Sequence, residues 1–176
     1  MAEISGIYFE EQEVATAQAG DNIKLKLKGI EEDEVSTGFV ICHPEKPVHV
    51  AKHFVAKLMV MDIKNIIAPG YTAVMHIHMA SEEVTIVKFI CMIDKKTGEK
   101  IAKRPKYLIQ GDAAIVQFEC KAVVCMEPID VSSQLARITL RDEGKTIAMG
   151  QVLKIIDGPQ DGNESANDQR QTVSPA

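Results

Sequence analysis

The sequence predicts an all-β protein: a first block with strands on the amino-terminal side, a complete antiparallel β-barrel of six to seven strands, and a disordered C-terminal tail. One observation is the alternation of apolar and polar side chains, clean in residues 22–28 and 137–141, because period two is typical of half-buried strands. A second is the spacing of turn residues by about 8 to 12 positions, which indicates a small barrel or sandwich. Closure is favoured because it removes the unpaired edges that so many strands otherwise expose.

Residues 1–43 form the first block. In residues 22–28, one isoleucine and two leucines point to one face and three lysines to the other, which predicts a half-buried antiparallel strand. Residues 31–36, which begin with an acidic run, are predicted to make one helical turn, and residues 39–42 are predicted to form another strand. Residues 44–51 contain two prolines and are interpreted as an extended linker.

Residues 52–156 form the second block, which is predicted to be nearly continuous strand. Strands are expected at residues 54–63, 72–79, 84–93, 114–120 and 123–126, with a loop at residues 80–83. After a helical turn at residues 132–135, residues 137–156 are predicted to form a hairpin. Its turn contains Gly144, since glycine accepts a positive φ without steric cost. Gly150, inside the second strand of the hairpin, indicates a bulge or a close backbone approach.

Composition and charge exclude several classes of protein. The 176-residue chain carries 20 basic and 25 acidic residues, a formal net charge of −5, which argues against a uniformly basic nucleic-acid binder. Its apolar runs are shorter than the roughly 18 residues of a membrane span, and its first residues lack a signal-peptide pattern, so no membrane partner is expected. The four cysteines lack a CxxC pair and are interpreted as free, buried thiols of a cytoplasmic protein. Residues 157–176 hold almost no apolar side chains and are predicted to be disordered.

No catalytic motif is recognisable in the sequence. The phosphate-binding loop GxxxxGK[ST] is absent: residues 144–146 match its last letters, but Thr139 stands where its first glycine belongs. The adjacent Cys42 and His43 do not by sequence position bring a thiolate to an imidazole. We therefore expect no enzymatic activity in this chain.

Two histidines on one predicted strand are candidate metal ligands. His76 and His78 are two positions apart, so both point to the same face of the strand. Zinc prefers four ligands in structural sites, and one strand supplies only two. Packed or hydrogen-bonded histidines are favoured, and no metal site is predicted.

Two groups of charged residues are candidate binding surfaces. With Ile138 and Leu140 pointing inward, Arg137, Thr139 and Arg141 point outward together. This strip is either a solvated strand face or a docking strip, since arginine is enriched at interface hot spots. The second group is the basic loop at residues 95–106, which is either a solubilising hairpin tip or a contact for RNA or an acidic partner. Its candidate contact residues are Lys95, Lys96, Lys100 and Lys103.

Several runs resemble one protein family. The run RITLRDEGKTIAMGQVLKI is similar to the closing motif of the third domain of translational GTPases related to elongation factor Tu, and within them to eukaryotic class-two release factors. That subfamily has Gly-Arg-Phe-Thr-Leu-Arg-Asp here; this chain has Ala136 and Ile138 in place of the glycine and phenylalanine. The runs GYTAVMHIHMASEEV and DKKTGEK add to the resemblance, and AGDNIKLKLKGI with STGFVIC resembles the end of the second domain. The resemblance implies that residues 1–43 are the last strands of that second domain, a partial barrel.

The resemblance implies a function in translation termination. Residues 52–156 are then the third domain, which in the family docks the class-one, stop-codon-reading release factor and meets the ribosome indirectly. GTP and Mg²⁺ are expected only in the family's nucleotide-binding domain, so no cofactor is expected for this chain. The partner-binding residues implied are Arg137, Thr139, Leu140, Arg141 and Asp142.

Two alternatives remain open at this point. One is the equivalent module of a ribosome-rescue GTPase. The other is that of elongation factor one-alpha, with tRNA or RNA binding by the barrels. The elongation factor usually has Met-Arg-Gln where this chain has Glu143-Gly144-Lys145. The acidic net charge also disfavours RNA, and no sequence-specific nucleic acid is expected as a partner.

Overall fold

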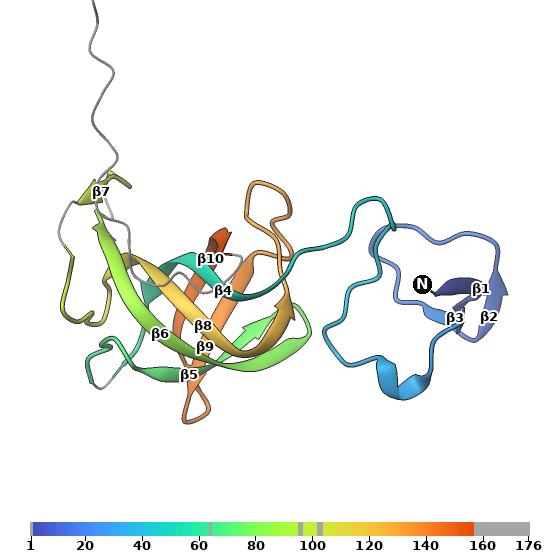
Figure 1. Cartoon of the computed structure of the whole chain (residues 1–176), viewed down its shortest axis with the longest axis horizontal. Helices are drawn as coiled ribbons and strands as arrows, with labels where there is room; N and C mark the ends of the chain where they lie inside the picture. The colour runs from blue at the N-terminus through green and yellow to red at the C-terminus, as the bar shows by residue number, and fades with distance from the viewer. Residues whose placement is uncertain (1, 64, 95–96, 102–103, 157–176) are drawn as a thin grey trace, which may run out of the picture.

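The computed structural model describes residues 2–63, 65–94, 97–101 and 104–156. These residues form a small three-stranded sheet and a larger barrel, joined by an irregular segment (Figure 1). The prediction of an all-β protein is confirmed: within the described ranges the helical content is one 3-10 turn, Glu32–Glu34. No helix in this part of the chain is long and apolar enough to cross a membrane.

Six antiparallel strands close the barrel. They follow the order β5-β9-β10-β4-β8-β6, and pairing between β5 and β6 completes the ring. A short strand, β7 (Lys100–Ile101), adds to the outer side of β6. The predicted barrel of six to seven strands and its closure are therefore confirmed. The six strands are β4 (Val50–Val60), β5 (Thr72–Ile77), β6 (Ala80–Ile93), β8 (Ala113–Cys125), β9 (Arg137–Asp142) and β10 (Lys145–Ile156).

Aliphatic side chains from all six strands fill the barrel. Phe54 and Phe118 stack at its centre, with ring centroids 5.2 Å apart and an interplanar angle of 18°. Around them lie fully buried residues such as Leu58, Met75 and Leu140. Each such side chain contributes roughly 1.5–3 kcal/mol on burial, before conformational entropy is counted. Because the packed core holds the six strands in place, the outward residues of the same strands also have fixed positions.

Two strand predictions in the barrel are wrong. Residues 80–83 are not a loop but the start of β6, because the turn lies at His78 and Met79, between the paired residues Ile77 and Ala80. His78 adopts φ 40 and makes this turn without a glycine. Residues 114–120 and 123–126 are not separate strands, since β8 runs through both and its far end pairs with the first residues of β4. Residues 132–135 make hydrogen-bonded turns but no helix.

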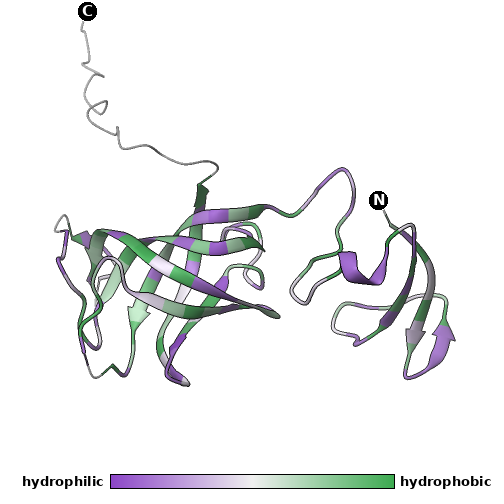
Figure 2. Ribbon diagram, turned by 60° about the horizontal axis from the view of Figure 1, so that its bottom comes forward, coloured by the Kyte–Doolittle hydropathy of each residue, from purple (hydrophilic) through white to green (hydrophobic). Residues whose placement is uncertain are grey.

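The amino-terminal sheet has the order β2-β1-β3. Its strands are β1 (Glu3–Phe9), β2 (Gln12–Val14) and β3 (Lys24–Lys28); the first two were not predicted. Figure 2 shows apolar and polar residues alternating along the strands of both units. The expected strand at residues 39–42 does not form: these residues are irregular, because none of the described strands pairs with them. The predicted disorder of residues 157–176 lies outside the described residues.

Candidate docking face on the barrel wall

The outward face of β9 carries the predicted strip. Ile138 and Leu140 are 2% and 1% exposed in the core, so Arg137 and Arg141 point out of the barrel, with the half-buried Thr139 between them. This orientation confirms the strand alternation expected from sequence. Leu140, also expected to bind the partner, lies inside the wall, so it supports the strip without offering contact surface.

Neighbouring strands extend the strip into a surface. Strand β9 lies between β5 and β10, and Thr139 is paired with His76 on one side and Met149 on the other. Met149 is in turn paired with Met59 of β4. The row therefore crosses four strands, a span of roughly 14 Å at 4.7–4.9 Å between strands. Met59 is 53% exposed and Met149 49% exposed, so the part of the row on β10 and β4 is apolar.

A second row of outward residues is polar. Arg137 is paired with Gln151, and Gln151 with Lys57. Together with the methionine row they border a hollow of about 410 Å³, whose described lining includes the cationic side chains of Lys57 and Arg137 and no carboxylate. We define the docking face by the outward residues Lys57, Met59, Arg137, Thr139, Arg141, Met149 and Gln151.

Gly150 confirms the predicted close approach beneath this face. A Cβ on Gly150 would lie 2.6 Å from the carbonyl oxygen of Lys57 and 3.1 Å from Cγ1 of Ile138. Any larger residue would push β10 away from β4. The small residue lets the three strands pack tightly below the exposed methionines.

The far end of the strip is held by local hydrogen bonds. Arg141 Nη2 donates to the carbonyl oxygen of Gly144 at 2.8 Å, across the tight turn that joins β9 to β10. The Tyr71 hydroxyl donates a short hydrogen bond to Asp142 Oδ2. Burial, followed by this hydrogen bond and the charge of Asp142, raises the pKa of Tyr71 to about 12. Asp142 thus has a structural partner, and the bond to Gly144 uses one of the several donors of the Arg141 guanidinium.

Sequence reasoning missed the methionines of the docking face. Their signal was present: Leu58 and Val60 alternate with Lys57 and Met59 in β4, so Met59 had to point outward. Only the pairing register, however, brings Met59 beside Met149, a residue far away in the sequence. The cations of the face take part in none of the ion pairs found among the described residues.

The other candidate residues of the sequence, its histidines and cysteines, do not come together in one site among the described residues. His78 uses Nε2 in a 2.9 Å hydrogen bond with the carbonyl oxygen of Cys125, which agrees with a structural histidine. In the described part of the chain, no group of three or more possible metal ligands occurs. Burial raises the pKa of the Cys120 thiol to about 12, which disfavours the nucleophilic thiolate. Cys42 is exposed, contrary to the expectation of buried thiols.

Only one of the four predicted basic-loop residues can be placed. Lys100 lies in β7 and is exposed. The other three, Lys95, Lys96 and Lys103, lie outside the described residues. Their proposed contact with RNA or an acidic partner stays a prediction.

Comparison with known proteins identifies the class. The family model of GTP-eEF1A C-terminal domain-like proteins matches residues 53–153, and the chain belongs to this family. Over 156 residues the chain is 41% identical to the eukaryotic peptide chain release factor GTP-binding subunit of Kluyveromyces lactis, and 36% identical to that of Schizosaccharomyces pombe. The resemblance seen in the sequence motifs is thereby confirmed.

The alignments cover most of this chain and a small part of its relatives. They take in 88% of this chain, 22% of the Kluyveromyces lactis protein and 23% of the Schizosaccharomyces pombe protein. The crystal structures of Sup35 complexed with GDP and with GMPPNP superpose with a TM-score of 0.83 at 36% identity. They cover 89% of this chain and 38% of those chains. The chain thus spans about a fifth of the length of the curated relatives that it matches.

Proposed function

We propose that this chain is a protein-binding module of translation termination that docks a class-one, stop-codon-reading release factor. The docking face is the observation that carries the proposal. It combines exposed methionines with arginines on a rigid barrel wall. The names of the relatives, all GTP-binding subunits of a peptide chain release factor, support termination as the process.

The chemistry of the docking face suits a protein partner. Methionine side chains are flexible and polarisable, so Met59 and Met149 adapt to an apolar surface. Arginine presents several donors in a planar fork that matches carboxylates and carbonyls, and it is enriched among hot-spot residues. A specific interface buries roughly 1,200–2,000 Å² in total, so the partner would cover the whole face.

The remaining features of this function are proposals of the same kind. The matched family segment is a carboxy-terminal domain, so GTP and Mg²⁺ would act elsewhere in a complete factor and this module would bind without a cofactor. The module would contact the ribosome only through its partner. Its place of action would be the cytoplasm, where termination on cytoplasmic ribosomes occurs.

Calorimetric titration with a class-one release factor tests the proposal. Arg137→Ala is the cleanest variant, because Arg137 is exposed and the structure shows no hydrogen bond from its side chain within the described residues. We expect about thirtyfold weaker binding, which corresponds to about 2 kcal/mol. Thermal melting should be unchanged. Arg141→Ala should weaken binding similarly, with a small loss of stability from its bond to Gly144.

Lys121→Ala is the matched control, because Lys121 is an exposed cation of β8 outside the docking face. It should bind like the parent chain. If both arginine variants bind as tightly as the control, the strip is a solvated face and the proposal is wrong.

A further inference from the structure

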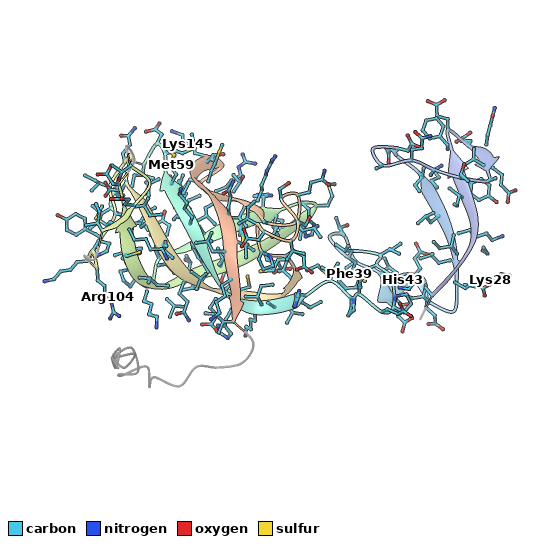
Figure 3. All side chains as sticks on the ribbon, turned by 90° about the horizontal axis from the view of Figure 1, so that it is seen from above. Lys28, Phe39, His43, Met59, Arg104 and Lys145 are labelled. Carbon is cyan, nitrogen blue, oxygen red and sulfur yellow. The ribbon has the colours of Figure 1, made fainter. Side chains whose placement is uncertain are left out.

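A second hollow lies on the barrel wall, away from the methionines of the docking face. It is formed by the outer sides of β10, β4, β8 and β6 and has a volume of about 390 Å³. Directly paired residues cross it in one row: Lys154, Val55, Gln117 and Lys88. Figure 3 shows Arg104, which also lines this hollow, at a different edge of the barrel from Met59. We name this second hollow, between the outer sides of β10, β4, β8 and β6, the basic hollow.

The floor of the basic hollow is apolar. Ile115 and Cys91 are buried there in a small cluster that is separate from the barrel core. Val55, Ile90 and Leu153 pack against this cluster and are only partly buried. Apolar side chains on the outside of a barrel wall are left in contact with water unless another group covers them.

The rim of the basic hollow is cationic. It carries Lys88, Lys100, Arg104 and Lys154, and no carboxylate is found among the described residues that line the hollow. Of the ion pairs found in the described ranges, none involves these four residues. The next outward acid along β8 is Glu119, and its Oε1 lies 4.0 Å from Nζ of Lys52, with which it forms an ion pair. Four cations therefore surround an apolar floor on a chain whose net charge is −5.

We propose that the basic hollow binds an acidic segment of a partner protein that carries one or two large apolar side chains. The carboxylates would meet the rim cations, and the apolar side chains would cover Val55 and Leu153. The volume is near the lower end of the roughly 300–1,000 Å³ found for ligand pockets, which fits a short anchor. This surface adds a second partner site and does not depend on the function proposed for the docking face.

The floor favours a peptide over RNA. Single-stranded nucleic acid is bound by basic grooves in which bases stack on exposed aromatic rings. Phe89 is the aromatic residue that lines the hollow, and it is buried. The hollow therefore attracts phosphates through its charge, but its described lining provides no exposed aromatic ring on which bases could stack.

The test uses the full chain and a fluorescein-labelled 12-residue peptide that alternates leucine with aspartate and glutamate. Fluorescence anisotropy measures affinity at low and high salt, and NMR shifts of assigned amides locate the contact. We expect shifts at Val55, Lys88, Gln117 and Lys154. The double variant Lys88→Glu/Lys154→Glu should bind about tenfold more weakly at low salt, because exposed charges act over a long Debye length there.

Three comparisons make the test decisive. The matched charge reversal Lys24→Glu/Lys121→Glu, at exposed lysines outside the hollow, should bind like the parent. A peptide with serine in place of leucine should bind more weakly; equal affinity would overturn the apolar anchor. A 12-nucleotide single-stranded RNA should bind more weakly than the leucine peptide; tighter binding with the same amide shifts would overturn the choice of partner.

Deleting residues 157–176 tests whether this segment of the chain itself, rather than an external partner, occupies the basic hollow. This acidic segment follows directly after Ile156, which lines the hollow. Unchanged amide shifts in the hollow on deletion would support an external partner. If the deletion itself shifts Val55 and Lys154 and strengthens peptide binding, the chain's own segment is the occupant and the proposal is wrong. Absence of peptide binding, or shifts confined to other strands, would also overturn it.

Discussion

Strands β3 and β9 have the same alternating pattern in very different surroundings. In β3, Leu25 and Leu27 face one side of a three-stranded sheet and stay half-buried, whereas the corresponding residues of β9 are almost completely buried. No residue from position 2 to position 50 is buried. The comparison teaches that alternation selects a face of the strand, while burial requires a second layer or ring closure.

Specific contacts hold the segment between the two units against the barrel. The backbone N–H of His49 donates to Glu127 Oε1 at 3.0 Å, and His49 Nδ1 lies 2.9 Å from Oε2 of the same carboxylate. Glu127 is only 6% exposed, so the barrel holds the end of the linker in a fixed place. Gly38 approaches Ala80 so closely that an added Cβ would lie 2.6 Å from the Ala80 Cβ. Figure 3 shows Phe39, next to this contact, between the two units.

The largest expected effect is the difference between the two units in how much a truncated apolar side chain lowers the free energy of unfolding. Phe118→Ala removes a ring from the closed core, and we expect a loss of about 3–5 kcal/mol in the free energy of unfolding. Leu25→Ala, in the open sheet, should cost less than about 1 kcal/mol, because little apolar surface is buried there. Urea denaturation followed by circular dichroism measures both. Equal costs would show that the amino-terminal sheet has a core of its own.

A smaller effect is expected where the linker meets the barrel. Glu127→Ala leaves the His49 N–H without its acceptor, and we expect a loss of about 1–3 kcal/mol. The His49 amide should also exchange its hydrogen faster. Glu45→Ala, at an exposed linker position, is the control and should change neither quantity. Slow exchange at His49 in the Glu127 variant would show that the linker is held by other contacts.

The smallest effect concerns the turn at the end of the docking face. The unfolded chain loses the Tyr71 proton near pH 10 and the folded chain near pH 12, so the unfolded state binds fewer protons between these values. Stability therefore falls as pH rises from about 10 to 12 and is fully present below pH 10. Tyr71→Phe should cost about 1 kcal/mol at pH 8 and flatten the alkaline decrease.

Urea titrations at pH 8, 10 and 11 check this prediction. Tyr107→Phe, at an exposed tyrosine, is the matched control and should keep the alkaline profile of the parent chain. A Tyr71 variant with the same alkaline decrease as the parent would mean that the contact with Asp142 does not control the titration.

Much of the barrel could be predicted because its signals are local. The hairpin of β9 and β10 follows from strict alternation and from a turn in which Glu143 and Gly144 both adopt a positive φ. Two of the strand errors have one cause, the dependence of a strand on its neighbours. Residues 39–42 have a strand-like composition and no partner, while the polar residues 81–83 continue β6 because β5 pairs with them.

The sequence by itself determined which side chains of each strand point outward, since the period of a strand is set by backbone sterics. It thereby determined the orientation of Arg137, Thr139 and Arg141. Only the tertiary structure decided which outward side chains become neighbours. Met59 meets Met149, and Val55 lies between Gln117 and Lys154, because ring closure and pairing register join strands that are distant in the chain. Both candidate surfaces therefore exist only in the closed barrel.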